Sequence, residues 1–290
     1  MATSTSVAFD EFKGKLLLTE PQNVLVRSRR ETCAGYLSTA FPVSSDLPLN
    51  FTKLIGSAGR STIIRPLDDI DVLAVFTNKD NVFERYRHNS QAFLYRIRDA
   101  LNEYQVQVVG ARGQAVRLFY ANAPHVDIAP VFSWNSGGYA LPDGTGGWLT
   151  TDPDVHETYM HQRNQDLGNR LKPMVRMLKR WNNEHGKNFK SFHLEALVAG
   201  AFSTLGNNSR EASEVFFGCA ASNVSVLDPA GYGGDLSGYL SWTARQDLQN
   251  GLRSAHTRAR NAIAAENQGD QREAIRLWRI VFGAEFPAYG

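Results

Sequence analysis

The sequence predicts an α+β fold in which a lobe built on a mixed sheet precedes a lobe built of helices. Four runs are rich in β-branched and apolar residues, which is typical of strands: 51–76 (a turn and a strand), 106–109, 115–120 and 125–132. Later runs show helical periodicity instead: 155–167, 171–185, 191–205, 242–266 and 270–281. We therefore expect two domains, 1–150 and 151–290, with a ligand site in the cleft between them.

Three further elements complete the expected first domain. Residues 8–40 predict a long amphipathic helix, or a pair of helices interrupted at Pro21. The apolar periodicity of residues 82–103 predicts a second amphipathic helix. The glycines at both ends of Gly110–Gly113 predict a hairpin turn between two strands. The stretch SGGYALPDGTGGWLTTDPDVH (136–156) is rich in Gly, Pro, Asp and Thr, so we expect it to be the loop that joins the domains.

Composition narrows the class of protein. The chain has 290 residues, of which 42% are hydrophobic and 21% charged, and this is typical of globular proteins with a sizeable core. No apolar run approaches the roughly 18 residues of a membrane span, and the N-terminus does not resemble a secretion signal. Two cysteines, at positions 33 and 219, give neither a disulfide framework nor a metal-binding spacing. We expect a cytoplasmic protein without a membrane partner.

The net charge of +2 predicts no stable complex with long nucleic acid. Proteins that hold such polymers usually carry a much larger basic excess, because binding neutralises many phosphates. A local basic pocket for a small polyanion is still compatible with this balance.

The chemistry of the chain centres on three acids in apolar surroundings. Asp69 and Asp71 lie one residue apart in a predicted strand, so both side chains point to the same face. Asp127 lies in a second predicted strand, between Val126 and Ile128. Two carboxylates this close repel each other unless a cation lies between them. Three carboxylates can hold two Mg²⁺ ions about 4 Å apart, and Mn²⁺ can substitute.

A small-residue turn precedes these acids. Gly56 allows a ligand to approach the backbone, and the Ser57 hydroxyl with neighbouring N–H groups can bind phosphate oxygens. Taken singly, each feature has an ordinary interpretation: a plain turn, a solvated pair of acids, or a satisfied core acid. Their order and spacing together predict a binding site for a nucleoside triphosphate.

This arrangement resembles the nucleotidyltransferase superfamily that shares the DNA polymerase β-like fold, in which Gly-Ser precedes Asp-x-Asp and a later third acid. Two segments, MVRMLKRWNNEHGKNFKSFHLEAL (174–197) and AIRLWRIVFGAEFP (274–287), resemble the helical C-terminal domain of oligoadenylate-synthetase-type enzymes. From about residue 8 to residue 287, the chain is similar to the bacterial cGAS/DncV-like nucleotidyltransferases, or CD-NTases. The resemblance implies a polymerase β-like lobe with an N-terminal spine helix and an active site in the inter-lobe cleft.

The resemblance assigns roles to particular residues. Asp69, Asp71 and Asp127 match the metal-binding catalytic acids, and Gly56 with Ser57 match the phosphate turn. Lys179 matches the lysine that holds the donor triphosphate, and Ser191 matches the serine that bonds the same phosphates. Phe192 falls where relatives often place a tyrosine that stacks on the donor base. The region of Trp148, Thr151 and Asp152 lines the base pockets in relatives.

For the other basic residues near these positions, the sequence allows more than one role. Lys172, Arg176 and Lys179 recur at helical spacing and share one face. Only the resemblance singles out Lys179, so we interpret Lys172 and Arg176 as a solvated basic face. Arg60 directly follows the Gly-Ser turn. It either contacts a phosphate or closes the loop, and the sequence favours neither role over the other.

By this resemblance the protein joins ATP, GTP, CTP or UTP into a cyclic di- or trinucleotide second messenger and releases pyrophosphate. The product then acts on a separate effector protein in anti-phage (CBASS) signalling, and we expect the enzyme to be a monomer. Two alternatives stay open at this point. One is a transferase that adds nucleotides to RNA ends, whose affinity would fall steeply with salt. The other is a silent module that senses nucleotides without turnover.

Overall fold

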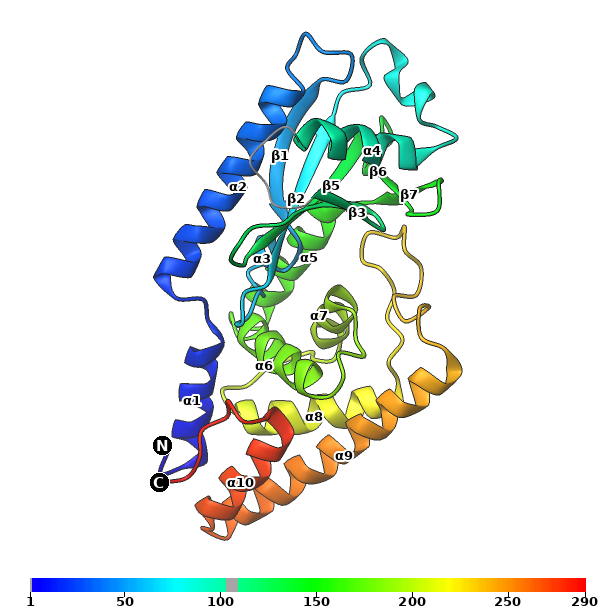
Figure 1. The fold of residues 1–290 in the computed structure, drawn as a ribbon. Coiled ribbons are helices and arrows are strands. Elements are labelled where there is room, and N and C mark those ends of the chain that lie inside the picture. The colour runs from blue at the N-terminus through cyan, green and yellow to red at the C-terminus, as the bar shows by residue number, and fades with distance from the viewer. Residues whose placement is uncertain (1, 103–108) are drawn as a thin grey trace. The chain divides into compact units, whose positions relative to one another are not determined.

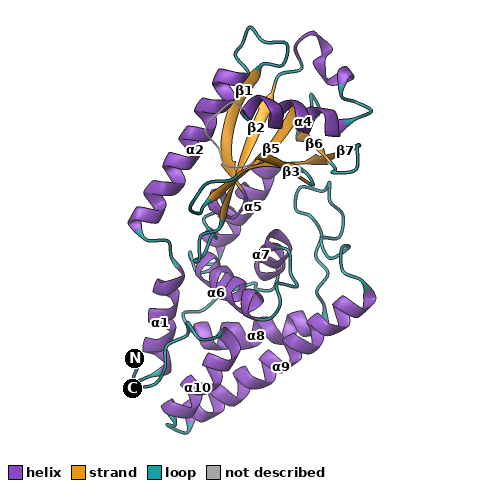
Figure 2. Ribbon diagram, viewed as in Figure 1, coloured by secondary structure: helices purple, strands orange, loops and turns teal. Residues whose placement is uncertain are grey.

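The computed structural model describes residues 2–102 and 109–290, which form two compact units. The sheet unit contains the described residues of 19–60 and 66–157, and the helical unit contains residues 2–18, 61–65 and 158–290. Every described strand belongs to the sheet unit (Figure 2), and this confirms the α+β class. The contiguous domains 1–150 and 151–290, and the cleft between them, stay predictions.

The described strands form a mixed sheet of seven, with the order β1-β2-β5-β4-β3 and a hairpin of β6 and β7 attached to β5. β2 and β5 run parallel, and the other pairs are antiparallel. The parallel pair occupies the middle of the sheet. Burial alternates along the first residues of each strand, where the acids lie, and becomes continuous further along. The strand bounds are β1 Leu49–Ile55, β2 Asp69–Phe76, β3 Val109–Arg112, β4 Ala115–Leu118, β5 His125–Ser133, β6 Tyr139–Pro142 and β7 Trp148–Thr151.

Two long helices accompany this sheet, α2 (Glu20–Ala40) and α4 (Ser90–Leu101) (Figure 1). The N-terminal helical region is the interrupted pair, since α1 ends at Leu16 and α2 begins at Glu20. Pro21 lies in the first turn of α2, where a missing N–H costs no helical hydrogen bond. The Thr19 side chain and Gln22 form a capping box that fixes this start.

Three expectations for the sheet unit were wrong in detail. The helix predicted at 82–103 begins only at Ser90, because Asn89 caps it, and residues 79–85 form separate 3₁₀ turns with a kink at Asp80 and Asn81. The hairpin turn lies at residues 113–114 rather than 110–113, since Arg112 pairs with Ala115. The predicted strand at 106–109 lies outside the described residues except for its last position. The stretch 136–156 is not a plain loop, because it contains β6, β7 and the start of α5.

Helices make up most of the helical unit. The helix expected at 191–205 ends at Gly200, where Arg163 donates hydrogen bonds to the carbonyls of Ala199 and Phe202. One helix, α8, was missed altogether. The bounds are α5 Pro153–Asp166, which continues from the sheet unit, α6 Leu171–Glu184, α7 Ser191–Gly200, α8 Ser209–Ser222, α9 Trp242–Asn267 and α10 Gln271–Phe282.

An aromatic cluster ties the two ends of the chain together in the core of the helical unit. Phe9 of α1 contacts Trp278 and Phe282 of α10, with ring centroids 4.9 and 5.8 Å apart. Phe12 contacts Phe282 as well, at 5.1 Å. All four side chains are almost fully buried. Because large aromatic side chains bury much apolar area, this cluster anchors α1 to the C-terminal helices.

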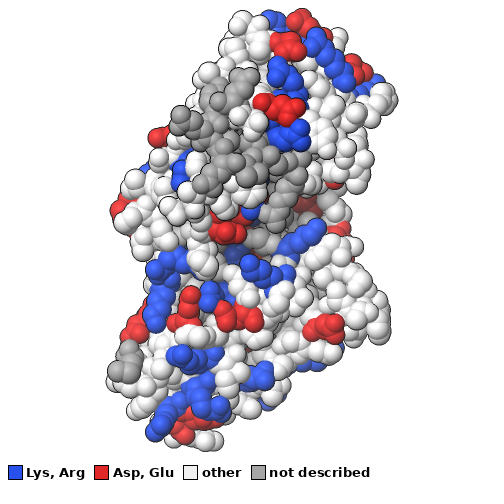
Figure 3. Space-filling model, viewed as in Figure 1, with Lys and Arg blue, Asp and Glu red and all other residues white. Residues whose placement is uncertain are grey.

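The described residues contain no helix long and apolar enough to span a membrane. Cys33 is buried, and burial raises the pKa of its thiol to about 12, whereas Cys219 is exposed. On the face drawn in Figure 3, Lys and Arg side chains are interspersed with Asp and Glu side chains.

Candidate active site

The three predicted acids lie on neighbouring central strands of the sheet unit. Asp69 and Asp71 occupy the first and third positions of β2, so their side chains share a face. Asp71 pairs with Asp127 across the parallel β2 and β5, and Asp127 pairs in turn with Arg117 across β5 and β4. The register therefore aligns Asp71, Asp127 and Arg117 in one row across three strands, with Asp69 two residues along β2.

Arg117 binds two of these acids. Its Nε and Nη2 atoms donate to the carboxylate oxygens of Asp127 at 2.5 and 2.6 Å, and Nη2 also donates to Asp69 at 2.7 Å. The Arg117 side chain is 7% exposed, against 18% for Asp127 and 42% for Asp69. The hydrogen bonds to Asp127 and the charge of both acids raise the pKa of Arg117, although burial opposes the shift. One buried cation thus neutralises much of the negative charge of this face.

Gly56 lies directly against Asp71. It has a φ of +63°, a conformation that glycine adopts without the strain other residues incur. A Cβ atom added at this position would lie 1.9 Å from Oδ2 of Asp71 and 2.7 Å from its Cγ. The space beside Gly56 is therefore filled by the Asp71 carboxylate, and only glycine leaves room for it.

The turn that follows Gly56 is compact. Residues Gly56–Gly59 form the short helix α3, in which Ser57 is partly exposed. The backbone N–H of Arg60 closes the turn on the carbonyl of Gly56 at 3.1 Å, and the Arg60 side chain is buried. The backbone of Arg60 thus closes the loop. A phosphate contact for its side chain, and for Ser57, stays a prediction.

The donor set at this face suits a hard divalent cation. Asp69, Asp71 and Asp127 offer only carboxylate oxygens, which Mg²⁺ prefers. The Arg117 guanidinium already binds Asp69 and Asp127, so this face of the sheet attracts positive charge. Among the residues that the structure describes, no three acid, histidine or cysteine side chains surround a single point as ligands of one metal ion. The three acids fit the predicted metal ions chemically, and their role as ligands stays a prediction.

Lys179 and Ser191, the two residues assigned to the donor triphosphate, meet in the helical unit. Both bind the carboxylate of Glu195: the ammonium of Lys179 lies 2.5 Å from Oε1, and the Ser191 hydroxyl donates to it at 3.2 Å. The Thr62 hydroxyl donates to the same oxygen at 2.9 Å, and Lys179 donates to the Thr62 carbonyl at 3.2 Å. Phe192, next to Ser191, is partly buried against the helical core, and its stacking on a base stays a prediction.

The remaining basic residues on α6 are not a simple solvated face. Arg176 donates to the carbonyl of Ser61 at 2.9 Å, and burial lowers the pKa of Arg176. It therefore holds the short segment 61–65 against α6. Lys172 is half-buried one turn earlier.

Trp148 and Thr151 do not lie in a loop, and Asp152 is the single residue that links β7 to α5. Trp148 and Thr151 are the first and last residues of β7, and Asp152 accepts hydrogen bonds from two backbone N–H groups at the start of α5. The Trp148 indole N–H donates to the Tyr86 carbonyl, and its ring contacts the core ring of Phe93. These contacts indicate a structural role for Trp148.

Sequence reasoning missed Arg117, Glu195 and Thr62. A signal existed for the first two, because each is a single charged residue within an apolar strand or helix: Val116-Arg117-Leu118 and Leu194-Glu195-Ala196. Such residues are rarely buried without a partner. Nothing in the local sequence marks Thr62, whose role depends on contact with distant helices.

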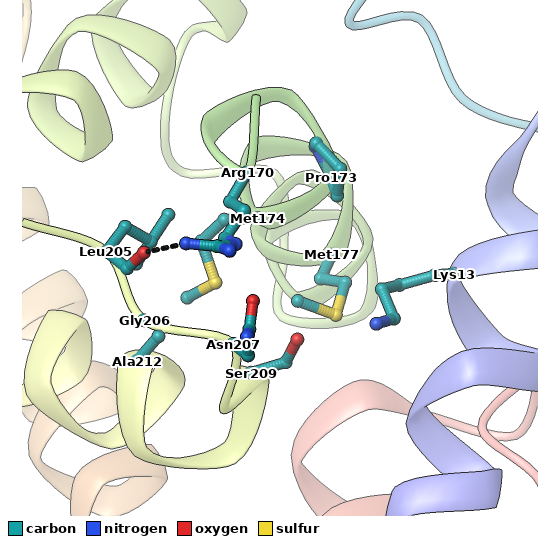
Figure 4. Close-up of a pocket in the computed structure, with 10 residues that line it drawn as sticks. All are labelled: Lys13, Arg170, Pro173, Met174, Met177, Leu205, Gly206, Asn207, Ser209 and Ala212. Carbon is teal, nitrogen blue, oxygen red and sulfur yellow. Dashed lines mark hydrogen bonds between the residues drawn. The ribbon is translucent and has the colours of Figure 1, made fainter. Parts of the chain in front are cut away.

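The helical unit also contains a cavity of about 230 Å³, shown in Figure 4. Arg170, Met174 and Met177 of α6 and the preceding turn line it, together with Leu205 and Lys13. Arg170 reaches across to donate to the Leu205 carbonyl at 3.0 Å. None of the predicted site residues lines this cavity, so it is separate from the candidate site.

Comparison with known proteins supports this assignment of fold and family. Residues 1–164 match the family described as the Second Messenger Oligonucleotide or Dinucleotide Synthetase domain. A Bacillus cereus protein named "Probable cyclic nucleotide synthase" is 28% identical, and the match covers 100% of this chain and 99% of the relative. An Acinetobacter protein named cyclic AMP-AMP-AMP synthase is 27% identical over 81% of this chain and 72% of its own length.

Solved structures share the fold. The structure of Escherichia coli MS115-1 CdnC with ATP has a TM-score of 0.78 at 19% identity, covering 97% of this chain and 98% of the other. Vibrio cholerae DncV, a cyclic AMP-GMP synthase in complex with a linear intermediate, has a TM-score of 0.77 at 15% identity, covering 96% and 97%. At these identities the likeness shows the fold alone.

Proposed function

Because the chain belongs to the Second Messenger Oligonucleotide or Dinucleotide Synthetase family, we propose that it joins nucleoside triphosphates into a cyclic di- or trinucleotide and releases pyrophosphate. The observation that carries the proposal is the row of Asp71, Asp127 and Arg117, with Asp69 beside it and Gly56 packed against Asp71. A face with three carboxylates beside a short Gly-Ser turn suits nucleotide phosphates bound with divalent cations.

In the proposed reaction, a ribose hydroxyl of the acceptor attacks the α-phosphorus of the donor. A bond forms between this oxygen and phosphorus, the bond to the bridging oxygen breaks, and pyrophosphate leaves with that oxygen. Asp127, 18% exposed and fixed by β5, accepts the hydroxyl proton. Asp69, Asp71 and Asp127 would hold Mg²⁺, which when bound would neutralise the charge that develops on the phosphates. A second transfer within the linear product closes the ring.

Other residues of the chain bind and orient the substrate. Gly56 and Ser57 are assigned to phosphate contacts in the sheet unit. Lys179 and Ser191 are assigned to the donor triphosphate, where a cation and a hydroxyl can bind the leaving phosphates. Phe192 is assigned to the donor base. This division of roles makes catalysis mainly a matter of positioning and electrostatics.

ATP is the first substrate to test. Two relatives are named for cyclic AMP-AMP-AMP, and the E. coli CdnC structure was solved with ATP. We further propose that the product acts on a separate effector protein in bacterial anti-phage signalling, as the family resemblance implies.

The test is incubation of the full chain with labelled ATP, GTP, CTP and UTP and with Mg²⁺ or Mn²⁺, followed by phosphatase digestion. A phosphatase-resistant product is expected, and its mass gives the bases and the ring size. Asp69→Asn with Asp71→Asn should abolish the product. Asp68→Asn, which changes an exposed acid one residue earlier, is the matched control and should leave it unchanged. Synthesis retained by the double variant would contradict the assigned site.

A further inference from the structure

The carboxylate of Glu195 connects the two residues assigned to the donor triphosphate. It lies in α7 one turn after Ser191, whose hydroxyl donates to it, and it forms an ion pair with Lys179 of α6. We propose that Glu195 is a positioning residue that holds Lys179 and Ser191 in the arrangement that binds the phosphates. This inference rests on the proposed function, because it presupposes that Lys179 and Ser191 bind the donor.

The geometry centres on one oxygen atom. Oε1 of Glu195 lies 2.5 Å from the Lys179 ammonium, 2.9 Å from the Thr62 hydroxyl and 3.2 Å from the Ser191 hydroxyl. These groups come from α6, from the 61–65 segment and from α7. A single carboxylate thus sets the distance between a cation and a hydroxyl that the sequence places twelve residues apart.

Burial explains why the carboxylate can act in this way. The Glu195 side chain is 0% exposed and that of Lys179 is 8% exposed. In such a site an ion pair is screened little by water, and a charge left without its partner is strongly unfavourable. A lysine otherwise has a flexible stem and rotatable donors, so its ammonium needs a fixed partner to stay in one place. Thr62 adds a second anchor through its carbonyl and hydroxyl, at 3.2 and 3.1 Å from the ammonium.

Glu195→Gln tests the proposal, because it keeps the size of the side chain and removes its charge. The readout is the affinity for a non-transferable ATP analogue with a methylene between the α- and β-phosphates, compared with the affinity for AMP. We expect the Kd of the triphosphate analogue to rise about tenfold, the effect of losing one charged hydrogen bond. We expect the Kd of AMP to change less than twofold. A merely structural role would move both values together.

Two control variants make the comparison specific. Glu214→Gln removes the charge of a second carboxylate in the helical unit, which forms a partly buried pair with His256, and should leave both Kd values unchanged. Lys179→Met tests the assigned cation itself. If Glu195 acts in part through Lys179, then adding Glu195→Gln to Lys179→Met should weaken binding of the analogue less than Glu195→Gln weakens it in the wild type, and the remaining loss is the share that passes through Ser191.

The outcomes separate the two proposals. If Lys179→Met leaves the triphosphate affinity unchanged, the assignment of Lys179 in the proposed function fails. If Lys179→Met weakens binding but Glu195→Gln does not, or tightens it, the positioning role of Glu195 is overturned. Thermal unfolding shows whether Glu195→Gln folds; if it does not, Glu195→Asp decides the question. That variant keeps the charge but shortens the side chain, so we expect about threefold weaker triphosphate binding, and unchanged binding would overturn the proposal.

Discussion

Gly56→Ala separates the function of the candidate site from the stability of the fold. The methyl group would lie 1.9 Å from Oδ2 of Asp71, so the carboxylate must move by about 1.5 Å to reach ordinary contact distance. Cγ and Cβ of Asp71 would also lie 2.7 and 3.0 Å from the added carbon, so the whole side chain must shift and not only its carboxylate. For a group that has to meet a phosphate or a metal ion, a displacement of about 1 Å can cost about a hundredfold in rate. We therefore expect kcat/KM to fall about a hundredfold.

The stability effect of the same substitution comes from the backbone. An alanine held at a φ of +63° costs about 1–2 kcal/mol of unfolding free energy. Gly113 provides a matched control, since its φ is +64° and nothing lies within 4 Å of a Cβ added there. Gly113→Ala should show the same backbone cost and keep its activity.

The assay combines urea unfolding with initial rates of pyrophosphate release from the wild type and both variants. We expect both variants to lose unfolding free energy, Gly56→Ala at least as much as Gly113→Ala, and we expect a large loss of rate in Gly56→Ala only. Equal rates for the two variants at equal Mn²⁺ affinity would refute the conclusion that the Asp71 carboxylate must occupy the space beside Gly56.

Three further predictions follow from the described contacts. Arg117→Met removes the guanidinium that competes with metal ions for Asp69 and Asp127, so the affinity of the nucleotide-free protein for Mn²⁺ should rise severalfold in a titration. An unchanged Mn²⁺ affinity would contradict the conclusion that Arg117 and the metal ions bind at the same position. Tyr139→Phe removes the hydrogen bond to Asp154, made at 2.7 Å, and should lower the unfolding free energy by about 1–3 kcal/mol at pH 7. Burial, with this hydrogen bond, raises the pKa of Tyr139 from 10.0 to about 12. The hydrogen bond therefore contributes fully to the unfolding free energy below pH 10, and this contribution is lost as pH rises from 10 to 12. Urea titrations should show the difference in unfolding free energy between wild type and variant shrinking over that range. Phe9→Ala should lower the unfolding free energy by about 3–5 kcal/mol, because it empties the centre of the aromatic cluster; a loss under 1 kcal/mol in calorimetry would contradict that packing.

Local patterns in the sequence predicted several elements well. Helical periodicity placed α6 at 171–185 and α10 at 270–281, within one residue of the observed bounds at each end. The prediction failed where one element ended and another began close by, as at Asn89. It also failed where Gly-rich composition concealed a hairpin. Strands β6 and β7 are four residues each, too short for alternation to stand out against their glycines.

The sequence by itself determined that Asp69 and Asp71 share a face, because side chains alternate along any strand. It also determined that Gly56 precedes them in a turn. Only the tertiary structure decided that Asp127 lies opposite Asp71, that Arg117 binds the acids and that Glu195 holds Lys179. These pairings join residues from different elements, so they depend on strand register and helix packing. A period of 2 or 3.6 residues specifies which face a side chain occupies, and it leaves open which distant residue that face meets.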